Sequence, residues 1–321
     1  MKADDFDFHR LPYLHGKPLA SALFRSRPED FIVDEIMDIE PSGEGEHLWL
    51  LISKRDQNTS WVAGLLAQLA GIKRGDVGFC GLKDRFAVTS QWFSLYLPGR
   101  DLDLSCLRHD DFQVMRSARH SKKLRRGMHQ GNKFEIILRD FSVDAIALQE
   151  RLNVIQKYGM PNYFGEQRFG HQGNNLREAQ TLISADKLKG NRHGTGLYLS
   201  AARSWLFNLV IEKRITENQL YLISEGGDTG PLWGRGRSSV GGVVGEIESR
   251  VLAPWDSWCY ALEHAGLKQQ RRSVLVLPDD IASDWMAKDQ LKLNFSLPNG
   301  CYATVLLREI AELYRPTEVS I

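Results

Sequence analysis

Residues 76–95 read DVGFCGLKDRFAVTSQWFSL, two apolar runs separated by a glycine and three consecutive charges. β-Branched and aromatic residues on both sides of a break that starts with glycine are typical of a strand, a tight turn and a second strand. This pattern puts Asp84 at the end of a strand, between Lys83 and Arg85. A carboxylate beside cations stays ionised at neutral pH and can act as a nucleophile or general base. An ordinary solvated turn, the commoner case, explains the same charges.

Two strands and a helix are predicted before this segment. Residues 25–35, RSRPEDFIVDE, contain a proline turn and then alternate in polarity, whereas residues 45–53, GEHLWLLIS, form an apolar run typical of a buried strand. A helix is predicted over residues 61–70, capped by Thr59 or Ser60. This order favours an α+β fold with an antiparallel sheet over a doubly wound one. Neither a P-loop nor a GxGxxG sequence follows a strand, so a nucleotide cofactor is not expected.

The second half of the chain begins with another strand and then changes character. A strand is predicted over residues 131–138 and an amphipathic helix over residues 143–158. Residues 161–175 are dense in Gly, Asn and aromatic residues, and the pattern beyond them is mainly helical. An alternating strand is predicted over residues 291–297, followed by a helix over residues 302–314.

One stretch of the chain is strongly basic although the formal net charge of the whole is only +1. Residues 116–133 contain seven Lys or Arg and two His, with no Asp or Glu. Such a one-signed stretch predicts a local surface for a polyanion, and a solvated loop is the alternative. The candidate RNA-binding residues are Lys122, Lys123, Arg125, Arg126 and Lys133.

Length and composition limit the class of protein. A chain of 321 residues exceeds what one hydrophobic core usually serves, so two domains are expected. No apolar run approaches the roughly 20 residues that span a bilayer. The N-terminal sequence MKADDFDFHR is acidic without an apolar region, so no secretory signal is expected. The four cysteines lie far apart without a CxxC pair, which argues against a zinc site or a disulfide framework and fits the cytoplasm.

Four motifs resemble those of the TruD family of pseudouridine synthases. The segment GFCGLKDRFAVTSQWFS is similar to the family's Gly-Leu-Lys-Asp-Arg signature, and RPEDFIVDE, HQGNKFEIIL and PNYFGEQRFG are similar to its other motifs. The resemblance covers essentially the whole chain and is strongest at residues 27–35, 76–94, 129–138 and 161–170.

The resemblance implies roles for individual residues. It makes Asp84 the catalytic residue, with Arg25 as the nearby cation where Lys is the more frequent family residue. This substitution keeps the charge but exchanges a point ammonium for a planar fork. Asn132 is implied to contact Asp84, and Phe134 is implied to pack against the target base. For Phe134 the alternating pattern equally fits a core strand residue, and Arg25 read alone is an ordinary surface arginine.

Two further residues are candidates for contact with the substrate. Lys83 stands next to the implied catalytic residue, and Arg168 lies in the third motif. The third motif equally fits a structural loop at a domain junction.

The resemblance also implies the architecture. It predicts a catalytic domain made of residues 1–155 and 300–321, with a mixed, largely antiparallel sheet and flanking helices. An α/β TRUD domain, residues 156–299, is expected as an insertion. No metal, redox cofactor or protein partner is implied, and a monomer is expected.

The implied reaction is the isomerisation of uridine to pseudouridine in tRNA, at uridine 13. A stacked base has no room to turn, so the nucleotide must be flipped into a pocket. Two schemes remain open for Asp84: attack on the ribose C1′, or removal of the 2′ proton to give a glycal.

Other functions use parts of the same pattern. A non-catalytic RNA-binding module of the same fold would not need Asp84. An aspartyl-phosphate hydrolase needs further carboxylates for Mg²⁺, which the Lys83-Asp84-Arg85 segment does not supply. A methyltransferase that uses S-adenosylmethionine would need a Gly-rich loop after an early strand. The four motifs together favour catalysis.

Overall fold

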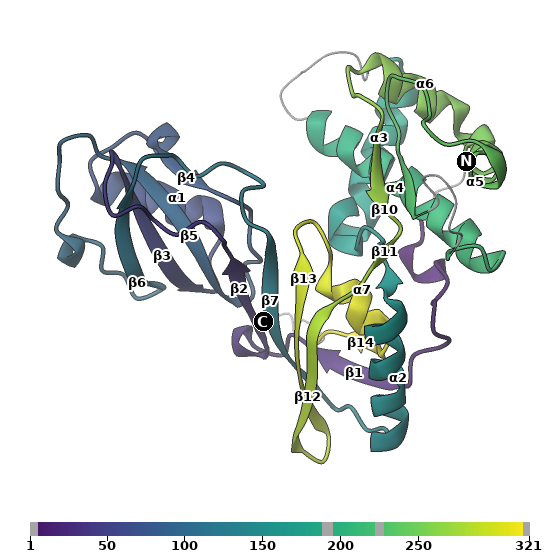
Figure 1. Ribbon diagram of the computed structural model, residues 1–321, viewed down its shortest axis with the longest axis horizontal. Helices are drawn as coiled ribbons and strands as arrows, with labels where there is room; N and C mark the ends of the chain where they lie inside the picture. Colours follow the sequence, from purple (N-terminus) through teal and green to yellow (C-terminus); the bar gives the residue numbers. More distant parts are fainter. Residues whose placement is uncertain (1–5, 188–194, 222–227, 317–321) are drawn as a thin grey trace. The chain divides into compact units, whose positions relative to one another are not determined.

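The computed structural model describes residues 6–187, 195–221 and 228–316 (Figure 1). The chain forms two compact units. The helical unit contains Met1–Pro18, Asn153–Leu277 and Cys301–Ile310, and the sheet unit contains Leu19–Leu152, Pro278–Gly300 and Ala311–Ile321. Within the described residues, no helix has the length and apolar character needed to cross a membrane.

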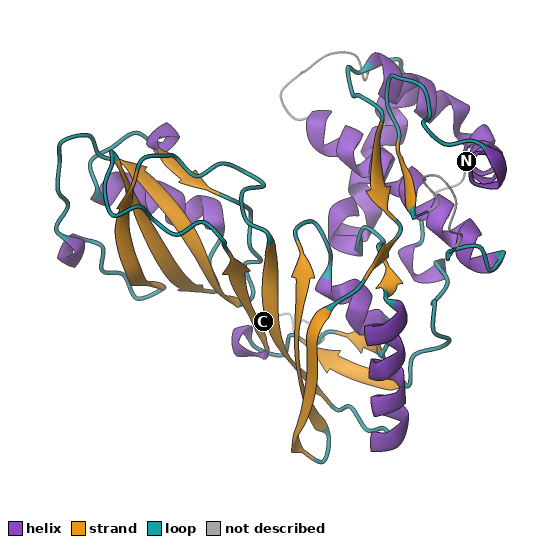
Figure 2. Cartoon of the chain, viewed as in Figure 1, coloured by secondary structure: helices purple, strands orange, loops and turns teal. Residues whose placement is uncertain are grey.

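The sheet unit is built on a mixed sheet that joins ten strands of the described chain (Figure 2). They are β1 (Ala20–Phe24), β2 (Phe31–Ile36), β3 (His47–Arg55), β4 (Val77–Phe79), β5 (Val88–Tyr96), β6 (Phe112–His120), β7 (Gly131–Arg139), β12 (Asp279–Ala287), β13 (Gln290–Pro298) and β14 (Ala311–Tyr314). The main path runs β12–β13–β7–β2–β5–β3–β6, with β1 and β14 attached through β7 and β4 attached to β5. Only β1 with β14 and β2 with β5 pair in parallel. The α+β class with a largely antiparallel mixed sheet is confirmed.

Helix α1 (Thr59–Leu69) covers one face of the part of the sheet that β3, β4, β5 and β6 form. Val62 and Leu66 of the helix belong to the same buried cluster as Leu50, Phe93 and Leu95 of the strands. The helix ends where Gly71 adopts a left-handed φ of 63°, a conformation that glycine reaches without the Cβ penalty. Burying this apolar stripe fixes the helix against the sheet.

The two predicted strands around Asp84 are confirmed, but the predicted tight turn is wrong: Asp84 lies in the middle of a longer connection and not at the end of a strand. β4 and β5 pair in antiparallel register from Val77↔Leu95 to Phe79↔Phe93. Residues 80–87 connect them and carry Asp84, and this connection is called the Asp84 loop below.

The helical unit packs its helices around α4. Its helices and short strands are α3 (Asn174–Ser184), α4 (Thr195–Thr216), α5 (Gly242–Leu252), α6 (Asp256–His264) and α7 (Ala303–Arg308), with β8 (Met160–Pro161) paired to β11 (Leu275–Val276) and β9 (Thr229–Leu232) paired to β10 (Gln270–Ser273). Helix α2 (Ala145–Tyr158) precedes them in the chain. Trp205, Leu206 and Phe207 of α4 are at most 2% exposed, in a cluster that also contains Trp258 of α6.

The predicted helix over residues 302–314 is wrong in its second half. Helix α7 ends at Arg308, and Ala311–Tyr314 form β14. This strand pairs in parallel with β1, from Ala20↔Ala311 to Leu23↔Tyr314. Hydrogen bonds to β1, whose edge would otherwise be open, decide the conformation of residues 311–314. These bonds join positions that lie almost 300 residues apart in the sequence.

The compact units divide the chain at positions that differ from the predicted domain boundaries. β12 and β13 lie inside the predicted insertion at residues 156–299, but β13 pairs with β7 from Leu291↔Leu138 to Pro298↔Gly131. Leu291, Leu293 and Phe295 alternate along β13 and are at most 1% exposed, so burial of this face joins the segment to the sheet. The assignment of catalysis to one unit stays a prediction.

Candidate active site

Asp84 and Arg25 lie together in the sheet unit. Arg25 Nη2 is 3.2 Å from Asp84 Oδ1, and the two side chains are 11% and 23% exposed. An ion pair that is this well covered from water acts through a lower effective dielectric than a surface pair does. The structure therefore brings together the predicted catalytic carboxylate and the predicted cation.

Arg25 is held in an unusual way. It follows β1 with a left-handed φ of 56°, a conformation that costs about 1 kcal/mol or more for a residue with a side chain. Its guanidinium carbon lies 3.8 Å from the centroid of the Phe31 ring. Burial lowers the pKa of Arg25, and the charge of Asp84 opposes that change. A planar guanidinium can stack on Phe31 and also bind a carboxylate, which an ammonium cannot do equally well.

Lys83 points away from solvent. Its ammonium lies 3.2 Å from Glu35 Oε1 and donates a 2.5 Å hydrogen bond to Asn132 Oδ1. The side chains of Lys83 and Glu35 are 5% and 0% exposed. Burial raises the pKa of Glu35, whereas the Lys83 charge and the Trp92 N–H group, 3.0 Å from Oε2, lower it. Lys83 thus fixes its own segment to β2 and β7. A contact of Lys83 with the substrate stays a prediction.

Asn132 is joined to the residue next to Asp84. The sequence predicted that its amide contacts the Asp84 carboxylate, and the structure shows its side-chain oxygen accepting from Lys83. Asn132 stands opposite Glu35 in the β2–β7 register, which explains why both residues reach the same ammonium.

Phe134 lies in the aromatic interior of the sheet unit. Its ring stacks on Phe295 with centroids 5.3 Å apart and lies 6.0 Å from Phe31, the ring under Arg25. At 5% exposure, Phe134 has the burial of a core strand residue. A role against the target base stays a prediction.

The Asp84 loop has anchors that the sequence interpretation missed. Thr59 Oγ1 accepts from the Lys83 N–H group at 2.9 Å and donates to Gln91 Oε1 at 2.7 Å. Gln91 Nε2 in turn donates to the Gly81 carbonyl at 3.1 Å. Thr59 was predicted as a helix cap, but Asn58 is the residue at the N-cap of α1. The hydroxyl of Thr59 instead serves the loop.

Lys54 is a further missed anchor. Its ammonium donates to the Asp84 carbonyl at 2.9 Å and to the Gln57 carbonyl at 2.6 Å. A signal was present in the sequence, because Lys54 shares the period-two face of β3 with Leu48, Leu50 and Ile52, all of them buried.

The basic stretch divides between β6, a connecting loop and the start of β7. The loop, residues 121–130, lies against the Asp84 loop, since the Gly127 N–H group donates to the Cys80 carbonyl at 2.8 Å. A Cβ atom on Gly81 would lie 3.1 Å from the His129 ring. Burial, reinforced by the Lys83 charge, lowers the pKa of His129 to about 4, so this ring is neutral at physiological pH. The basic loop is therefore a neighbour of the candidate catalytic residue.

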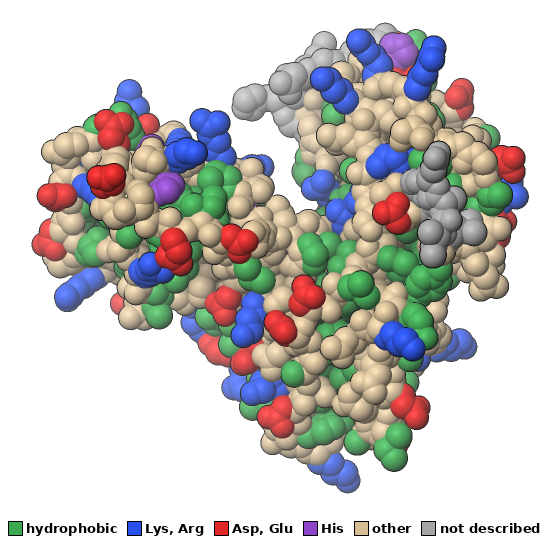
Figure 3. All heavy atoms as spheres, viewed as in Figure 1, with side chains coloured by type: hydrophobic (Ala, Val, Ile, Leu, Met, Phe, Trp, Pro, Cys, Tyr) green, Lys and Arg blue, Asp and Glu red, His purple; other side chains and the backbone are tan. Residues whose placement is uncertain are grey.

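The predicted RNA-binding cations differ in exposure. Lys122, Arg125, Arg126 and Lys133 are exposed. Lys123 is half-buried, and its ammonium donates to the Gly75 carbonyl. On the face of the molecule that Figure 3 shows, Lys and Arg side chains are interspersed with acidic ones. Contact of the exposed cations with RNA stays a prediction.

Arg168 belongs to the helical unit. It lies in a short 3-10 helix, Glu166–Phe169, and donates to the hydroxyl oxygens of Ser200 at 2.5 Å and Ser204 at 3.3 Å. Its guanidinium carbon is 5.6 Å from the Phe164 ring centroid. These contacts fix the third motif to α4. Arg168 takes no part in the Arg25–Asp84 ion pair.

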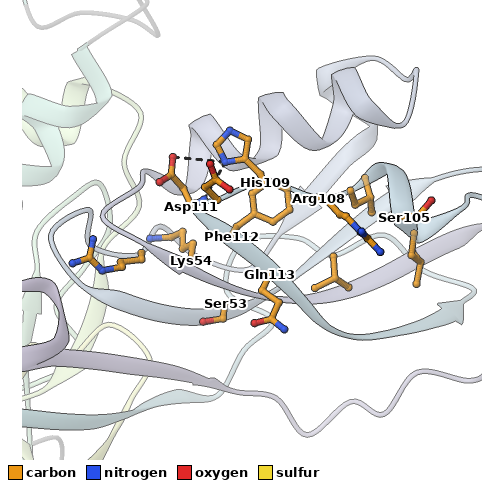
Figure 4. A pocket seen from close by; sticks show the side chains of 13 residues that line it. Ser53, Lys54, Ser105, Arg108, His109, Asp111, Phe112 and Gln113 are labelled. Carbon is orange, nitrogen blue, oxygen red and sulfur yellow. Dashed lines mark hydrogen bonds and ion pairs between the residues drawn. The ribbon is translucent and has the colours of Figure 1, made fainter.

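A surface pocket of about 680 Å³ lies on β3, β6 and the loop before β6 (Figure 4). Figure 4 shows Lys54 close to Asp111 and Phe112, on the side of the pocket away from Ser105. The described residues that line it do not include Asp84 or Arg25. Lys54 both lines this pocket and donates a hydrogen bond to the Asp84 carbonyl, so it lies between the pocket and the Asp84 loop.

The fold is shared with a crystal structure from Methanosarcina mazei that is assigned as tRNA pseudouridine synthase D (TruD). The TM-score is 0.70 at 21% sequence identity, over 94% of this chain and 96% of that chain. At this identity the similarity establishes the fold and nothing further.

Sequence comparison gives the family. The family model described as TruD, tRNA pseudouridine synthase D, matches residues 9–192 and 227–310. The chain is 45% identical to the tRNA pseudouridine synthase D of Cellvibrio japonicus, over 94% of this chain and 93% of the relative. It is 41% identical to the protein of the same name from Nitrosococcus oceani, over 97% and 96%. Fold and motifs together define the class of pseudouridine synthases. Within that class, the chain belongs to the TruD family.

Proposed function

We propose that this protein converts uridine 13 of tRNA to pseudouridine and that Asp84 is its catalytic carboxylate. The observation that carries the proposal is the covered Arg25–Asp84 pair, with 3.2 Å between Nη2 and Oδ1, and both residues lie within the part of the chain that the family model matches. Relatives of 37–45% identity along most of the chain carry the name tRNA pseudouridine synthase D.

The reaction breaks the N1–C1′ bond of uridine and forms a C5–C1′ bond. N1 gains a proton and C5 loses one, so the product is an isomer of the substrate. The carboxylate of Asp84 either attacks C1′ or removes the 2′ proton, and Arg25, 3.2 Å from Oδ1, orients the carboxylate in both schemes. The base must leave its stack before it can turn.

Binding of the tRNA is assigned to surfaces around this carboxylate. The exposed cations of the basic loop contact phosphates, because cationic side chains on one surface track an RNA backbone. Phe134 supports the base through the aromatic cluster that includes Phe31, and stacking on an aromatic ring is worth about 1–3 kcal/mol per base.

The test measures pseudouridine in tRNA by carbodiimide labelling and primer extension. Asp84→Asn keeps the shape of the side chain but removes its charge, so we expect the rate to fall about 10³-fold or more. Asp284→Asn, at an exposed position on β12, is the matched control and should keep the wild-type rate. A tRNA with cytidine at position 13 should give no product.

Binding of the same tRNA is measured separately for each variant. Retained binding by Asp84→Asn, with conversion by the wild type only, identifies Asp84 as the chemical residue. Conversion by Asp84→Asn at the wild-type rate contradicts its role. Binding without conversion by the wild type would favour a non-catalytic RNA-binding module of the same fold.

A further inference from the structure

Lys54 is a fully buried lysine beneath the Asp84 loop. Its side chain is 1% exposed, on the face of β3 that also carries Leu50 and Ile52. A buried ammonium is costly to desolvate and is normally paired with a carboxylate. Among the described residues no carboxylate oxygen lies within 4.0 Å of this ammonium, and its hydrogen bonds go to the carbonyls of Gln57 and Asp84.

Through the carbonyls of Gln57 and Asp84, Lys54 connects the start of α1 to the Asp84 loop. Gln57 lies just before α1, and Asp84 is the residue that carries the proposed chemistry. The other anchors of the loop, Thr59 and Gln91, bind the main chain at Lys83 and Gly81. Lys54 therefore binds the Asp84 peptide itself, 2.9 Å from its oxygen, while Arg25 binds the side chain.

We propose that Lys54 is a positioning residue: its ammonium holds the main chain of Asp84 so that the carboxylate stays beside Arg25. The proposal rests on the proposed role of Asp84. A displacement of about 1 Å in a reacting group can cost on the order of 100-fold in rate. A charged donor makes a stronger hydrogen bond to a carbonyl than a neutral donor does, so the protonated amine is the holding form.

The charge of Lys54 gives the proposal a pH signature. Burial lowers the pKa of Lys54 to about 8, with the charge of Asp84 opposing, that of Lys83 reinforcing and that of Asp56 opposing the change. The amine is therefore protonated below about pH 8 and neutral above it. The protonated form therefore predominates at neutral pH, and the holding contact weakens as the pH rises through about 8.

The experiment compares Lys54→Met, which removes the charge at similar volume, with Lys54→Arg, which keeps it. At pH 7 we expect Lys54→Met to lower kcat about 10- to 100-fold, with KM for tRNA little changed, because the tRNA-binding surface is intact. Lys54→Arg should recover part of this loss. Lys288→Met, at an exposed position between β12 and β13, is the control and should match the wild type.

The profile of kcat against pH separates positioning from a merely structural role. The ratio of wild-type kcat to Lys54→Met kcat should shrink as the pH rises through about 8, because the wild type then loses the same charge. Lys54→Arg stays charged and should lack the fall near pH 8. A structural role predicts one constant ratio that follows the folded fraction, measured by thermal unfolding at each pH.

The proposal is overturned by a wild-type kcat in Lys54→Met, or by a ratio that does not change with pH. If Lys54→Met does not fold, Lys54→Arg alone decides, since an unchanged fall near pH 8 in that variant contradicts the proposal. Asp84→Asn is measured in parallel. Activity in Asp84→Asn would refute the proposed function, whereas normal activity in Lys54→Met refutes only the role of Lys54.

Discussion

At Arg25 one guanidinium serves two neighbours. It stacks on Phe31 at 3.8 Å and pairs with Asp84 at 3.2 Å, from a backbone position with φ of 56°. Stacking restrains the plane of the guanidinium, so the ion pair has a defined direction as well as a charge. The left-handed backbone of Arg25 and the burial of its guanidinium are both unfavourable, and the contacts with Phe31 and Asp84 offset them.

Replacing Arg25 tests this account at the scale of the residue. Arg25→Ala leaves the Asp84 carboxylate without its cation, and we expect single-turnover conversion of tRNA to slow by about 100-fold or more. Arg25→Lys restores the charge without the stacked plane, so its rate should lie between those of Arg25→Ala and the wild type. Arg55→Ala, an exposed arginine of β3, is the control. A wild-type rate in Arg25→Ala would contradict the role of the pair.

At the scale of the element, sequence patterns identified what is local. The apolar runs around Asp84 predicted a hairpin, and β4 and β5 form it. The anchors of its loop were missed because each joins positions far apart in the chain, such as Lys54 with Asp84. Periodicity shows that Lys54 faces inward, but only the fold shows which carbonyls it meets. The resemblance implied that Asn132 contacts Asp84, and in the structure its side-chain oxygen accepts from the adjacent residue of the same loop, Lys83.

The basic loop makes a prediction about tRNA binding. Lys122, Arg125 and Arg126 are exposed beside the Asp84 loop, and each phosphate contact releases a bound counterion. Changing all three to Gln should weaken binding and reduce the slope of log K against log salt by about one unit per lost contact. Titrations of tRNA binding at several salt concentrations measure this slope.

A matched variant gives the comparison for this slope. Lys73, Arg108 and Lys288 are exposed cations of the sheet unit outside the basic loop, and their change to Gln removes the same total charge. An equal loss of slope in both triple variants would mean that net charge, and not the basic loop, governs binding.

At the scale of the whole molecule, the class of fold was predictable from the sequence, whereas the strand partners of β12, β13 and β14 were not. Two domains followed from length, and the mixed sheet followed from the resemblance. The return of residues 278–300 to the sheet depends on the pairing of β13 with β7, and β14 depends on pairing with β1. Contacts between segments far apart in the chain determine which strands pair, and the local sequence pattern does not contain this information.

Asp30 joins two of these strands through a buried ion pair. Its carboxylate, 0% exposed, accepts from Arg139 Nη2 at 2.7 Å and Nε at 2.9 Å, and Arg27 Nε lies 3.2 Å away. The pair fastens the entry of β2 to the end of β7, the strand that neighbours β13, β2 and β1. Burial opposes ionisation, but the hydrogen bonds from Arg139 and Arg27 lower the pKa of Asp30 below its ordinary value of 3.8.

Asp30→Asn should therefore destabilise the fold in a pH-dependent way. Removing one partner of a buried ion pair costs about 3 kcal/mol, so the free energy of unfolding should fall by that amount at pH 7. Because the folded pKa lies below the unfolded one, this contribution is present above about pH 3.8 and is lost as the pH falls through the folded pKa. Denaturant unfolding of both proteins from pH 7 to pH 3 should show two curves that converge at the acid end. If the difference in the free energy of unfolding between the two proteins is constant with pH, packing and not the charge of Asp30 accounts for the loss. The double variant Asp30→Asn with Arg139→Met should recover part of the loss, because it also removes the unpaired cation.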